Sequence, residues 1–211
     1  MRPYVVAHVA VSVEGATDGF APDLAQFYGL AATWSEDVTL VGADTILAQE
    51  PALAATPGPG PAPGGPLLAV VDSQARVQQW AALRDAGHWS GVLALYAAST
   101  PPRPAGADVT ELVTGDDRVD LSATLSTLAD RGARVVRVDS GGTLIGALLH
   151  RGLLDELSLL VHPVLAGAAG TRHWHGAAPP PEGPLEPAGA QPLDGGLVWL
   201  RYRTPGATPP R

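Results

Sequence analysis

The sequence predicts an α/β fold in which a mostly parallel sheet is flanked by helices. Apolar, β-branched stretches of strand length alternate along the chain with stretches whose apolar residues recur at helical spacing. The last two strand-like stretches, residues 157–165 and 197–203, have no clear helical pattern between them. That arrangement indicates an antiparallel edge or hairpin at the end of an otherwise parallel sheet.

The N-terminal half supplies the first four strands of this prediction. A helix is expected within residues 22–34, where Leu24, Phe27, Tyr28 and Ala31 are spaced to share one face. A second, short helix over residues 78–87 should end at Gly87. The predicted strands are residues 4–13, 38–41, 67–71 and 92–96.

The C-terminal half begins with a well-marked helix. Asp120 is placed to cap it, and Gly132 supplies a stop signal. A strand over residues 133–138 then runs directly into Ser140–Thr143, after which Leu144, Ile145, Leu148 and Leu149 predict a buried helix.

The chain of 211 residues is expected to form one domain, residues 1–211. The Pro/Gly tract at residues 56–66 is either an interdomain linker or a surface loop; we favour the loop because neither flank looks self-sufficient. Residues 204–211 are expected to be an irregular tail.

Composition excludes several classes of function. The net charge is −8 and the basic residues are scattered, so nucleic acid and anionic membranes are poor partners. The chain has no cysteine, no apolar run long enough to span a bilayer and no signal-peptide pattern, which fits a cytoplasmic protein. It also has no lysine, which excludes Schiff-base catalysis on a lysine side chain.

The joint at Ser140–Thr143 is the strongest candidate site. In α/β sheets ligands bind beyond the carboxyl ends of strands, and a helix that begins there offers free N–H groups to a phosphate. Gly141 and Gly142 would let a diphosphate approach the backbone. The alternative, which spacing alone favours, is a tight strand–helix turn without a ligand.

A resemblance to a known family covers nearly the whole chain. The segment "VDSGGTLIGALLHRGLLDELSLLVHPVLAG" closely resembles the reductase domain of riboflavin biosynthesis, whose fold is dihydrofolate-reductase-like, with three layers and a central mixed sheet. Four further segments agree in order: "RPYVVAHVAVSVEG", "LVGADTILAQEPAL", "VVDSQARV" and "LRYR".

The resemblance implies NADPH as the cofactor and a homodimer as the assembly. It assigns the diphosphate to Gly141, Gly142, Thr143 and Leu144. It also implies cofactor contacts from Thr45, Gln49, Ser73 and Arg76. Arg76 is expected either to pair with the 2′-phosphate or to be a solvated loop residue.

The substrate side departs from the family pattern. His8 stands where the family has a lysine, and Glu14 and Asp139 each differ by one methylene from the family's carboxylate. We predict these three as catalytic residues, with Leu53 and Asp139 as substrate-binding residues. Thr56 stands where an arginine usually binds the ribose phosphate, which makes the phosphorylated substrate uncertain.

Other polar residues are expected to be structural. His173 and His175 have no convincing third ligand, so no metal site is predicted. His162, Asp155 and Glu156 are expected to have structural roles as well.

The resemblance therefore implies an NADPH-dependent reductase of riboflavin biosynthesis. Its expected small-molecule substrate is a ribosylated aminopyrimidine of the 5-amino-6-(5-phosphoribosylamino)uracil type. The alternatives are the same fold acting on a pterin or an imine, and a nucleotide-binding protein without turnover. We also expect Gly142→Val to weaken cofactor binding and leave the fold largely intact.

Overall fold

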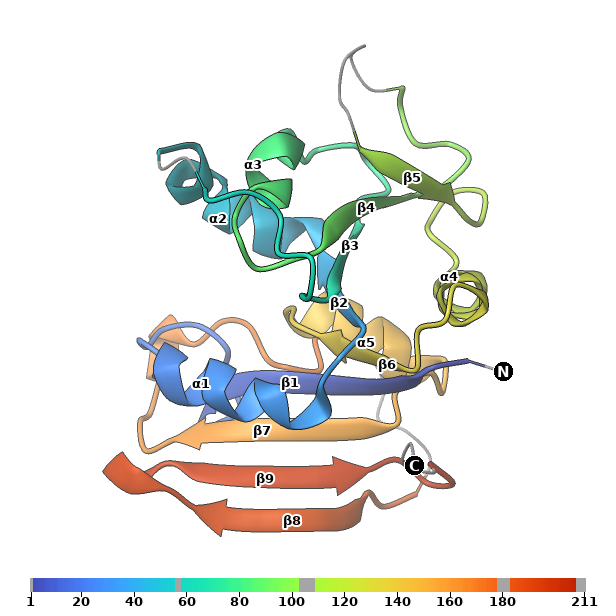
Figure 1. Ribbon diagram of the computed structural model, residues 1–211. Coiled ribbons are helices and arrows are strands. Elements are labelled where there is room, and N and C mark those ends of the chain that lie inside the picture. Colours follow the sequence, from blue (N-terminus) through green and yellow to red (C-terminus); the bar gives the residue numbers. More distant parts are fainter. Residues whose placement is uncertain (1, 56–57, 103–108, 178–182, 208–211) are drawn as a thin grey trace. The chain divides into compact units, whose positions relative to one another are not determined.

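The structure is a computed structural model that describes residues 2–55, 58–102, 109–177 and 183–207 (Figure 1). The chain forms two compact units. The first unit comprises Met1–Pro3 and Glu36–Val136, and the second comprises Tyr4–Ser35 and Arg137–Arg211. Within the described residues, no helix has the length and apolar character needed to cross a membrane.

The first unit is built on parallel strands in the order β5-β4-β3-β2. These strands are β2 (Val38–Gly42), β3 (Leu67–Val71), β4 (Gly91–Tyr96) and β5 (Thr110–Val113). The helices are α2 (Ala43–Ala55), α3 (Trp80–Arg84) and α4 (Leu121–Asp130). Because the strands are parallel, the segments that follow β2, β3 and β4 leave the same edge of the sheet.

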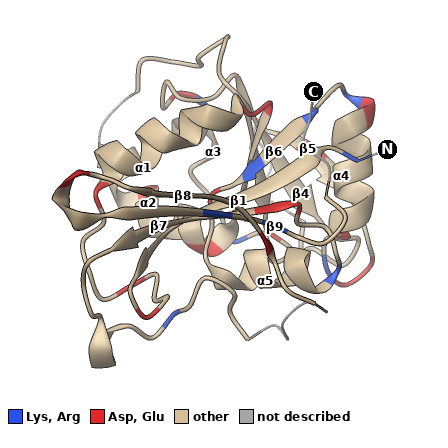
Figure 2. Cartoon of the chain, turned by 90° about the horizontal axis from the view of Figure 1, so that it is seen from below, with Lys and Arg blue, Asp and Glu red and all other residues tan. Residues whose placement is uncertain are grey.

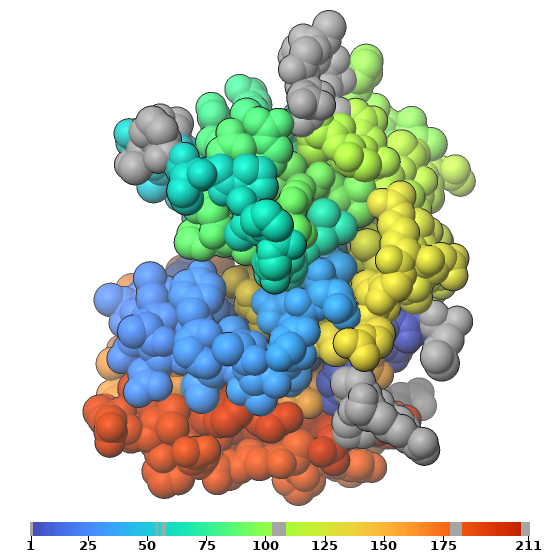
Figure 3. Space-filling view, in the orientation of Figure 1, coloured from blue at the N-terminus to red at the C-terminus, as the bar shows by residue number. Residues whose placement is uncertain are grey.

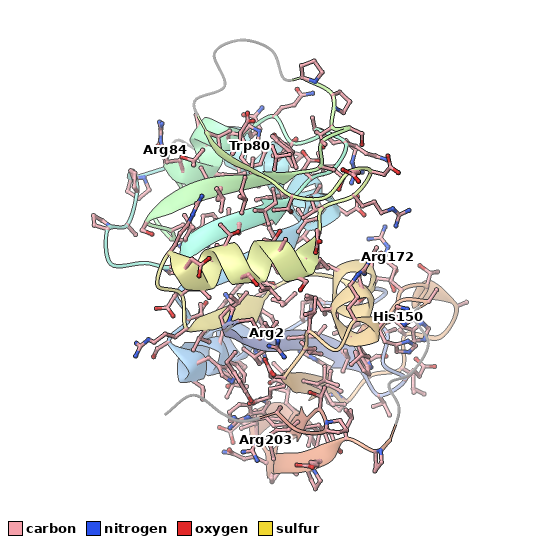
Figure 4. The ribbon with its side chains drawn as sticks, turned by 90° about the vertical axis from the view of Figure 1, so that its right-hand side faces the viewer. Arg2, Trp80, Arg84, His150, Arg172 and Arg203 are labelled. Carbon is pink, nitrogen blue, oxygen red and sulfur yellow. The ribbon has the colours of Figure 1, made fainter. Side chains whose placement is uncertain are left out.

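Helix and core signals in this unit behave as the sequence predicts. The Asp120 carboxylate accepts the N–H groups of Ser122 and Ala123, and Gly132 takes a φ of +96° just after α4. Trp80, labelled in Figure 4, is 3% exposed and belongs to the core between α2, α3 and the sheet. Burial of a large aromatic side chain explains why so short a helix is held in place.

The second unit combines parallel and antiparallel pairing, in the order β1-β7-β9-β8. Its strands are β1 (Tyr4–Ser12), β7 (Glu156–His162), β8 (Glu186–Pro192) and β9 (Val198–Arg203). β1 and β7 are parallel, and both β7–β9 and β9–β8 are antiparallel. Helices α1 (Leu24–Ala31) and α5 (Gly142–His150) complete it, with the 3₁₀ turns η1 (Ala32–Trp34), η2 (Gly167–Ala169) and η3 (Asp194–Gly196). The chain passes from the first unit to the second within β6 (Val135–Val138).

The predicted α/β class, the mostly parallel strands and the antiparallel end are confirmed. The predicted loop is a loop over its described residues, 58–66, and its first two residues lie outside the described part of the chain. The tail is described only to residue 207 and has no helix or strand there.

One helix and two strands were not predicted. Helix α2 contains Pro51, which normally argues against a helix interior. β8 lies in a Pro/Gly-rich segment, and it tolerates Pro187 and Pro192 because it is an edge strand. β5 is short and largely exposed, so its sequence has little of the apolar character that reveals a strand.

Candidate functional site

The glycine turn, residues Ser140–Thr143, follows β6 and starts α5, as predicted. Gly141 is the N-cap residue of α5 and has no capping side chain. Space is open where a Cβ of Gly141 would lie, and Gly141 and Thr143 are both exposed. The first N–H groups of α5 therefore have an exposed approach, which suits an anionic group such as a diphosphate. Leu144 is buried at 7% exposure, so only its backbone is suited to such a contact.

Gly142 has a different role from its neighbour. A Cβ at this position would collide with the carbonyl oxygen of His173 and the backbone nitrogen of Gly176. The expectation that Gly142→Val leaves the fold largely intact is therefore wrong, because rigid backbone atoms occupy the space. At Gly141, in contrast, an added Cβ would meet no atom of the described residues within 4 Å, apart from those of its immediate chain neighbours.

Asp139 lies between β6 and the glycine turn. Its Oδ2 atom accepts a hydrogen bond from Nη1 of Arg137 at 3.1 Å, and the Arg137 side chain is only 6% exposed. The buried guanidinium thus orients a partly exposed carboxylate at the carboxyl end of β6. Sequence reasoning missed Arg137, which stands within an apolar strand and looked like part of its scattered charge.

Tyr28 is a second residue that the sequence analysis assigned only to a helix face. It is 50% exposed on α1, so this part of the predicted apolar face is not buried. Desolvation raises the pKa of its hydroxyl, and the negative charge of Asp139 raises it further, against a lowering effect of Arg137. The phenol thus remains protonated at neutral pH beside a carboxylate and an arginine.

His8 is buried and bonded at both ring nitrogens. Nδ1 lies 2.9 Å from Oγ of Ser158, and Nε2 lies 2.9 Å from the carbonyl oxygen of Phe27. A carbonyl accepts only, so Nε2 carries the proton and Nδ1 accepts from the Ser158 hydroxyl. That hydroxyl in turn accepts a hydrogen bond from Nε1 of Trp199 at 2.8 Å.

These contacts do not support a positively charged His8 in the place of the family's lysine. Desolvation lowers the pKa of His8 to about 4, with a further lowering from the charge of Arg137, and the Phe27 carbonyl only partly offsets this. The ring is therefore neutral at neutral pH. It stacks on Phe27 with 4.3 Å between ring centroids, which ties α1 to β1.

Glu14 lies just beyond β1, and its carboxylate binds the backbone of a loop. Its Oε2 atom accepts hydrogen bonds from the N–H groups of Ala166 and Gly167, at 2.7 and 3.1 Å. These groups belong to the N-terminus of η2. The catalytic role predicted for Glu14 stays a prediction, and its contacts are those of a residue that fixes a loop.

In the first unit, Thr45, Gln49 and Leu53 all belong to α2. Thr45 lies in the first turn after β2, close to the carboxyl edge of the sheet, and Gln49 lies one turn further and is exposed. Leu53 packs against the core of this unit, which accounts for it without a ligand. Only Thr45 therefore lies at the edge where ligands bind in α/β sheets.

Ser73 and Arg76 lie in the loop that follows β3. Asp72 shapes this loop by accepting the N–H groups of Arg76 and Val77, and Oγ of Ser73 accepts the N–H of Val119. Arg76 pairs with Asp44 at 2.8 Å, and both side chains are well exposed. An exposed pair of this kind contributes little to stability, so the guanidinium can exchange Asp44 for a phosphate at small cost.

Asp155 and Glu156 have the structural contacts that the sequence analysis expects, and His173 and His175 form no metal site within the described residues. Asp155 accepts the N–H of Val5, and Glu156 accepts hydrogen bonds from Tyr4 and Arg201. The rings of His173 and His175 lie 6.0 Å apart. In the described part of the chain, no three His, Asp or Glu residues are grouped so that they could hold a metal ion.

Comparison with known proteins identifies the family. The model of the RibD C-terminal domain family matches residues 3–198. The chain belongs to the RibD C-terminal domain family. Two curated relatives are both named 2,5-diamino-6-ribosylamino-4(3H)-pyrimidinone 5′-phosphate reductase. The relative from Archaeoglobus fulgidus is 32% identical over 79% of this chain and 83% of its own length. The relative from Methanothermobacter thermautotrophicus is 30% identical over 82% of this chain and 83% of its own length.

Several solved structures share the fold. A pyrimidine reductase-like protein from Corynebacterium diphtheriae superposes with a TM-score of 0.71 at 15% identity, over 95% of this chain and 91% of that one. Acinetobacter baumannii RibD gives 0.69 at 19% identity, over 96% of this chain and 58% of that one. Enterococcus faecalis dihydrofolate reductase gives 0.50 at 14% identity, over 95% of each chain. The predicted dihydrofolate-reductase-like fold and riboflavin-reductase family are thus confirmed, and this RibD C-terminal domain is an oxidoreductase.

Proposed function

We propose that the chain is an NADPH-dependent reductase of a ribosylaminopyrimidine 5′-phosphate in riboflavin biosynthesis. The open glycine turn at the start of α5, directly after Asp139, is the observation that carries this proposal. Membership of the RibD C-terminal domain family supports it. The family model extends over both units, so we interpret residues 1–211 as one reductase domain.

Two chemically related pyrimidines are candidate substrates, and the names of the relatives favour the diaminopyrimidinone over the uracil. Both are named for a 2,5-diamino-6-ribosylamino-4(3H)-pyrimidinone 5′-phosphate. The uracil-type substrate that the sequence analysis put first carries a carbonyl oxygen on the ring carbon that bears one of the amino groups in the diaminopyrimidinone. We therefore propose the diaminopyrimidinone as the preferred substrate. Thr56, which replaces the expected phosphate-binding arginine, lies outside the described residues.

The residues of the second unit have two proposed functions, cofactor binding and assistance of substrate protonation. Gly141 and Thr143 would hold the diphosphate through the backbone at the start of α5, with the helix dipole favouring the negative charge. When bound, the nicotinamide supplies a hydride. Asp139, oriented by Arg137, would accept hydrogen bonds from the substrate's amino groups and assist protonation at a C=N bond.

In the first unit, Arg76 is our candidate for the adenosine 2′-phosphate. It lies in a loop at the carboxyl edge of the parallel strands, and its present partner is the exposed Asp44. Replacement of a single carboxylate by a dianionic phosphate would favour NADPH over NADH. Thr45 and Ser73, at the same edge, are proposed as further cofactor contacts.

The first experiment is a thermal-shift titration of the purified protein with NADPH and NADH. A ligand that binds only the folded state stabilises it by about 2.7 kcal/mol at a hundredfold excess over its dissociation constant. We expect a clear rise in melting temperature with NADPH and little with NADH. Absence of a shift with either nucleotide would contradict the proposal.

Turnover is then measured as NADPH oxidation with the diaminopyrimidinone phosphate, its uracil counterpart and the dephosphorylated forms of both. We expect the highest kcat/KM with the phosphorylated diaminopyrimidinone. Preference for a dephosphorylated compound would reject the phosphate ester as the natural substrate. It would favour a reductase of the same fold with another substrate.

A further inference from the structure

Two acidic residues in the segment after β1 bind the backbone of a loop more than a hundred residues away in the chain. We define this brace loop as residues 166–176, between β7 and β8. Glu14 binds its start through Ala166 and Gly167. Asp18 binds its middle: Oδ1 accepts the N–H groups of Thr171 and Arg172 at 2.8 and 2.9 Å, and Oδ2 accepts the Thr171 hydroxyl at 2.7 Å.

The contacts continue along both segments. The N–H of Thr17 donates to the carbonyl oxygen of Arg172 at 2.8 Å, and Ala16 forms an antiparallel bridge with His173. Hydrogen bonds to Asp18, above all from the N–H of Arg172, lower the pKa of its carboxyl group. The carboxylate therefore stays ionised, and its charge strengthens each of these bonds at neutral pH.

The far end of the brace loop lies against the glycine turn. The carbonyl of His173 and the backbone of Gly176 fill the space in which a Cβ of Gly142 would lie. Conversely, a Cβ of Gly176 would approach the carbonyl oxygen of Gly142 to 2.8 Å. Gly176 has a φ of +60°, and its N–H donates to His173. The loop thus supports one side of the turn and leaves the side of Gly141 open.

We propose that Glu14 and Asp18 are positioning residues that hold the brace loop against the glycine turn and so set the geometry of its anion-binding backbone. The proposal rests on the proposed function in that it takes this turn as the cofactor site. Neither carboxylate needs to touch cofactor or substrate. A bound diphosphate requires its N–H donors in a fixed arrangement, and two acidic side chains maintain that arrangement from a distance.

The test uses Asp18→Ala and Glu14→Ala, the conservative variants Asp18→Asn and Glu14→Gln, and Asp117→Ala as a control. Asp117 is an exposed aspartate of the first unit. Arg172, labelled in Figure 4, is an exposed residue of the brace loop and provides a tryptic site in it. Loop fixation is therefore measured as the rate of cleavage after Arg172 in the native protein, alongside Kd for NADPH, KM and kcat.

For each alanine variant we expect faster cleavage after Arg172 and a Kd for NADPH raised by roughly tenfold. In Asp18→Ala, kcat at saturating cofactor should change by less than about threefold. The asparagine and glutamine variants should recover part of the affinity, and Asp117→Ala should match the wild type. Wild-type affinity in both alanine variants would overturn the proposal, as would unchanged cleavage. If the wild-type protein itself binds no NADPH, the proposed function fails, and faster cleavage in Asp18→Ala would still support the brace.

Discussion

At the scale of single residues, His8 shows how burial changes a predicted role. The sequence places a titratable side chain where the family has a lysine, but a strand position alone does not reveal its partners. Ser158 and the Phe27 carbonyl occupy both ring nitrogens, and burial keeps the ring neutral. The burial of this neutral ring should make the free energy of unfolding depend on pH.

We expect His8 to make the protein less stable in mild acid. Its pKa is about 4 in the folded protein against 6.5 unperturbed, so between these values the unfolded chain binds the proton more readily. Stability from this group is full above pH 6.5 and is lost as pH falls toward 4, by at most about 3 kcal/mol. Urea unfolding at several pH values would measure it. His8→Gln should show a shallower slope than the wild type, and equal slopes would contradict the assignment.

The two adjacent glycines of the turn should respond in opposite ways to substitution. Gly141 has a φ of −80°, which any residue adopts, and open space beyond it. We expect Gly141→Val to keep the melting temperature and to lose NADPH affinity. Gly142→Ala should lower the melting temperature, because the backbone of His173 and Gly176 blocks its methyl group. Calorimetry with and without NADPH separates these outcomes, and equal melting temperatures for both variants would refute the distinction.

At the scale of elements, strands β1, β7 and β9 share a polar face that the sequence did not reveal. Paired residues in neighbouring strands point to the same side, so His8, Ser158 and Arg201 form one row across the sheet. The guanidinium carbon of Arg201 lies 5.6 Å from the ring centroid of Trp34 and 5.3 Å from that of Trp199, which are cation–π distances. It also pairs with the buried Glu156 at 2.6 Å.

Loss of Arg201 alone should be costly. Arg201→Met leaves Glu156, which is 3% exposed at its side chain, without its cation, and we expect a loss of about 3 kcal/mol in unfolding free energy. The double variant Arg201→Met, Glu156→Gln should recover part of this loss, because the neutral amide can still accept the Tyr4 hydroxyl. Chemical denaturation of both variants and of Glu156→Gln gives the unfolding free energies for a double-mutant cycle. A double variant as unstable as the single one would contradict this account.

Sequence reasoning recovered elements with strong local signals and missed those stabilised from outside. Asp120 and Gly132 revealed the two ends of α4, because helix capping and termination depend only on residues close by in the sequence. β8 and α2 contain prolines, and only tertiary context makes them acceptable. The glycine turn was found, but the roles of Gly141 and Gly142 depend on a loop far along the chain. Arg137 and Asp18 were missed for the same reason.

For the whole molecule, the family and fold were recognisable because ordered short motifs extend over most of the chain. The charges gave no comparable signal: acidic and basic residues are spread over many elements (Figure 2). The assembly was also not evident in the sequence. β8 and β9, orange to red in Figure 3, lie at the surface of the second unit.

We expect a homodimer formed through this late part of the sheet. One face of β7 and β9 carries half-buried apolar side chains: Leu159, Val161, Val198, Leu200 and Tyr202. An apolar sheet face of this kind is stabilised when a second copy covers it. Light scattering after size-exclusion chromatography should give the dimer mass. Leu200→Glu should shift it to the monomer, whereas a monomeric wild-type protein would rule out this assembly.

The contact between Gly142 and Gly176 also limits how the chain can evolve. Each position occupies space that a side chain at the other would need, although the two lie far apart in the sequence. Neither can change alone without moving the other's backbone. In a library that randomises both codons and selects for a folded product, we expect variants that keep glycine at one position to keep it at the other as well.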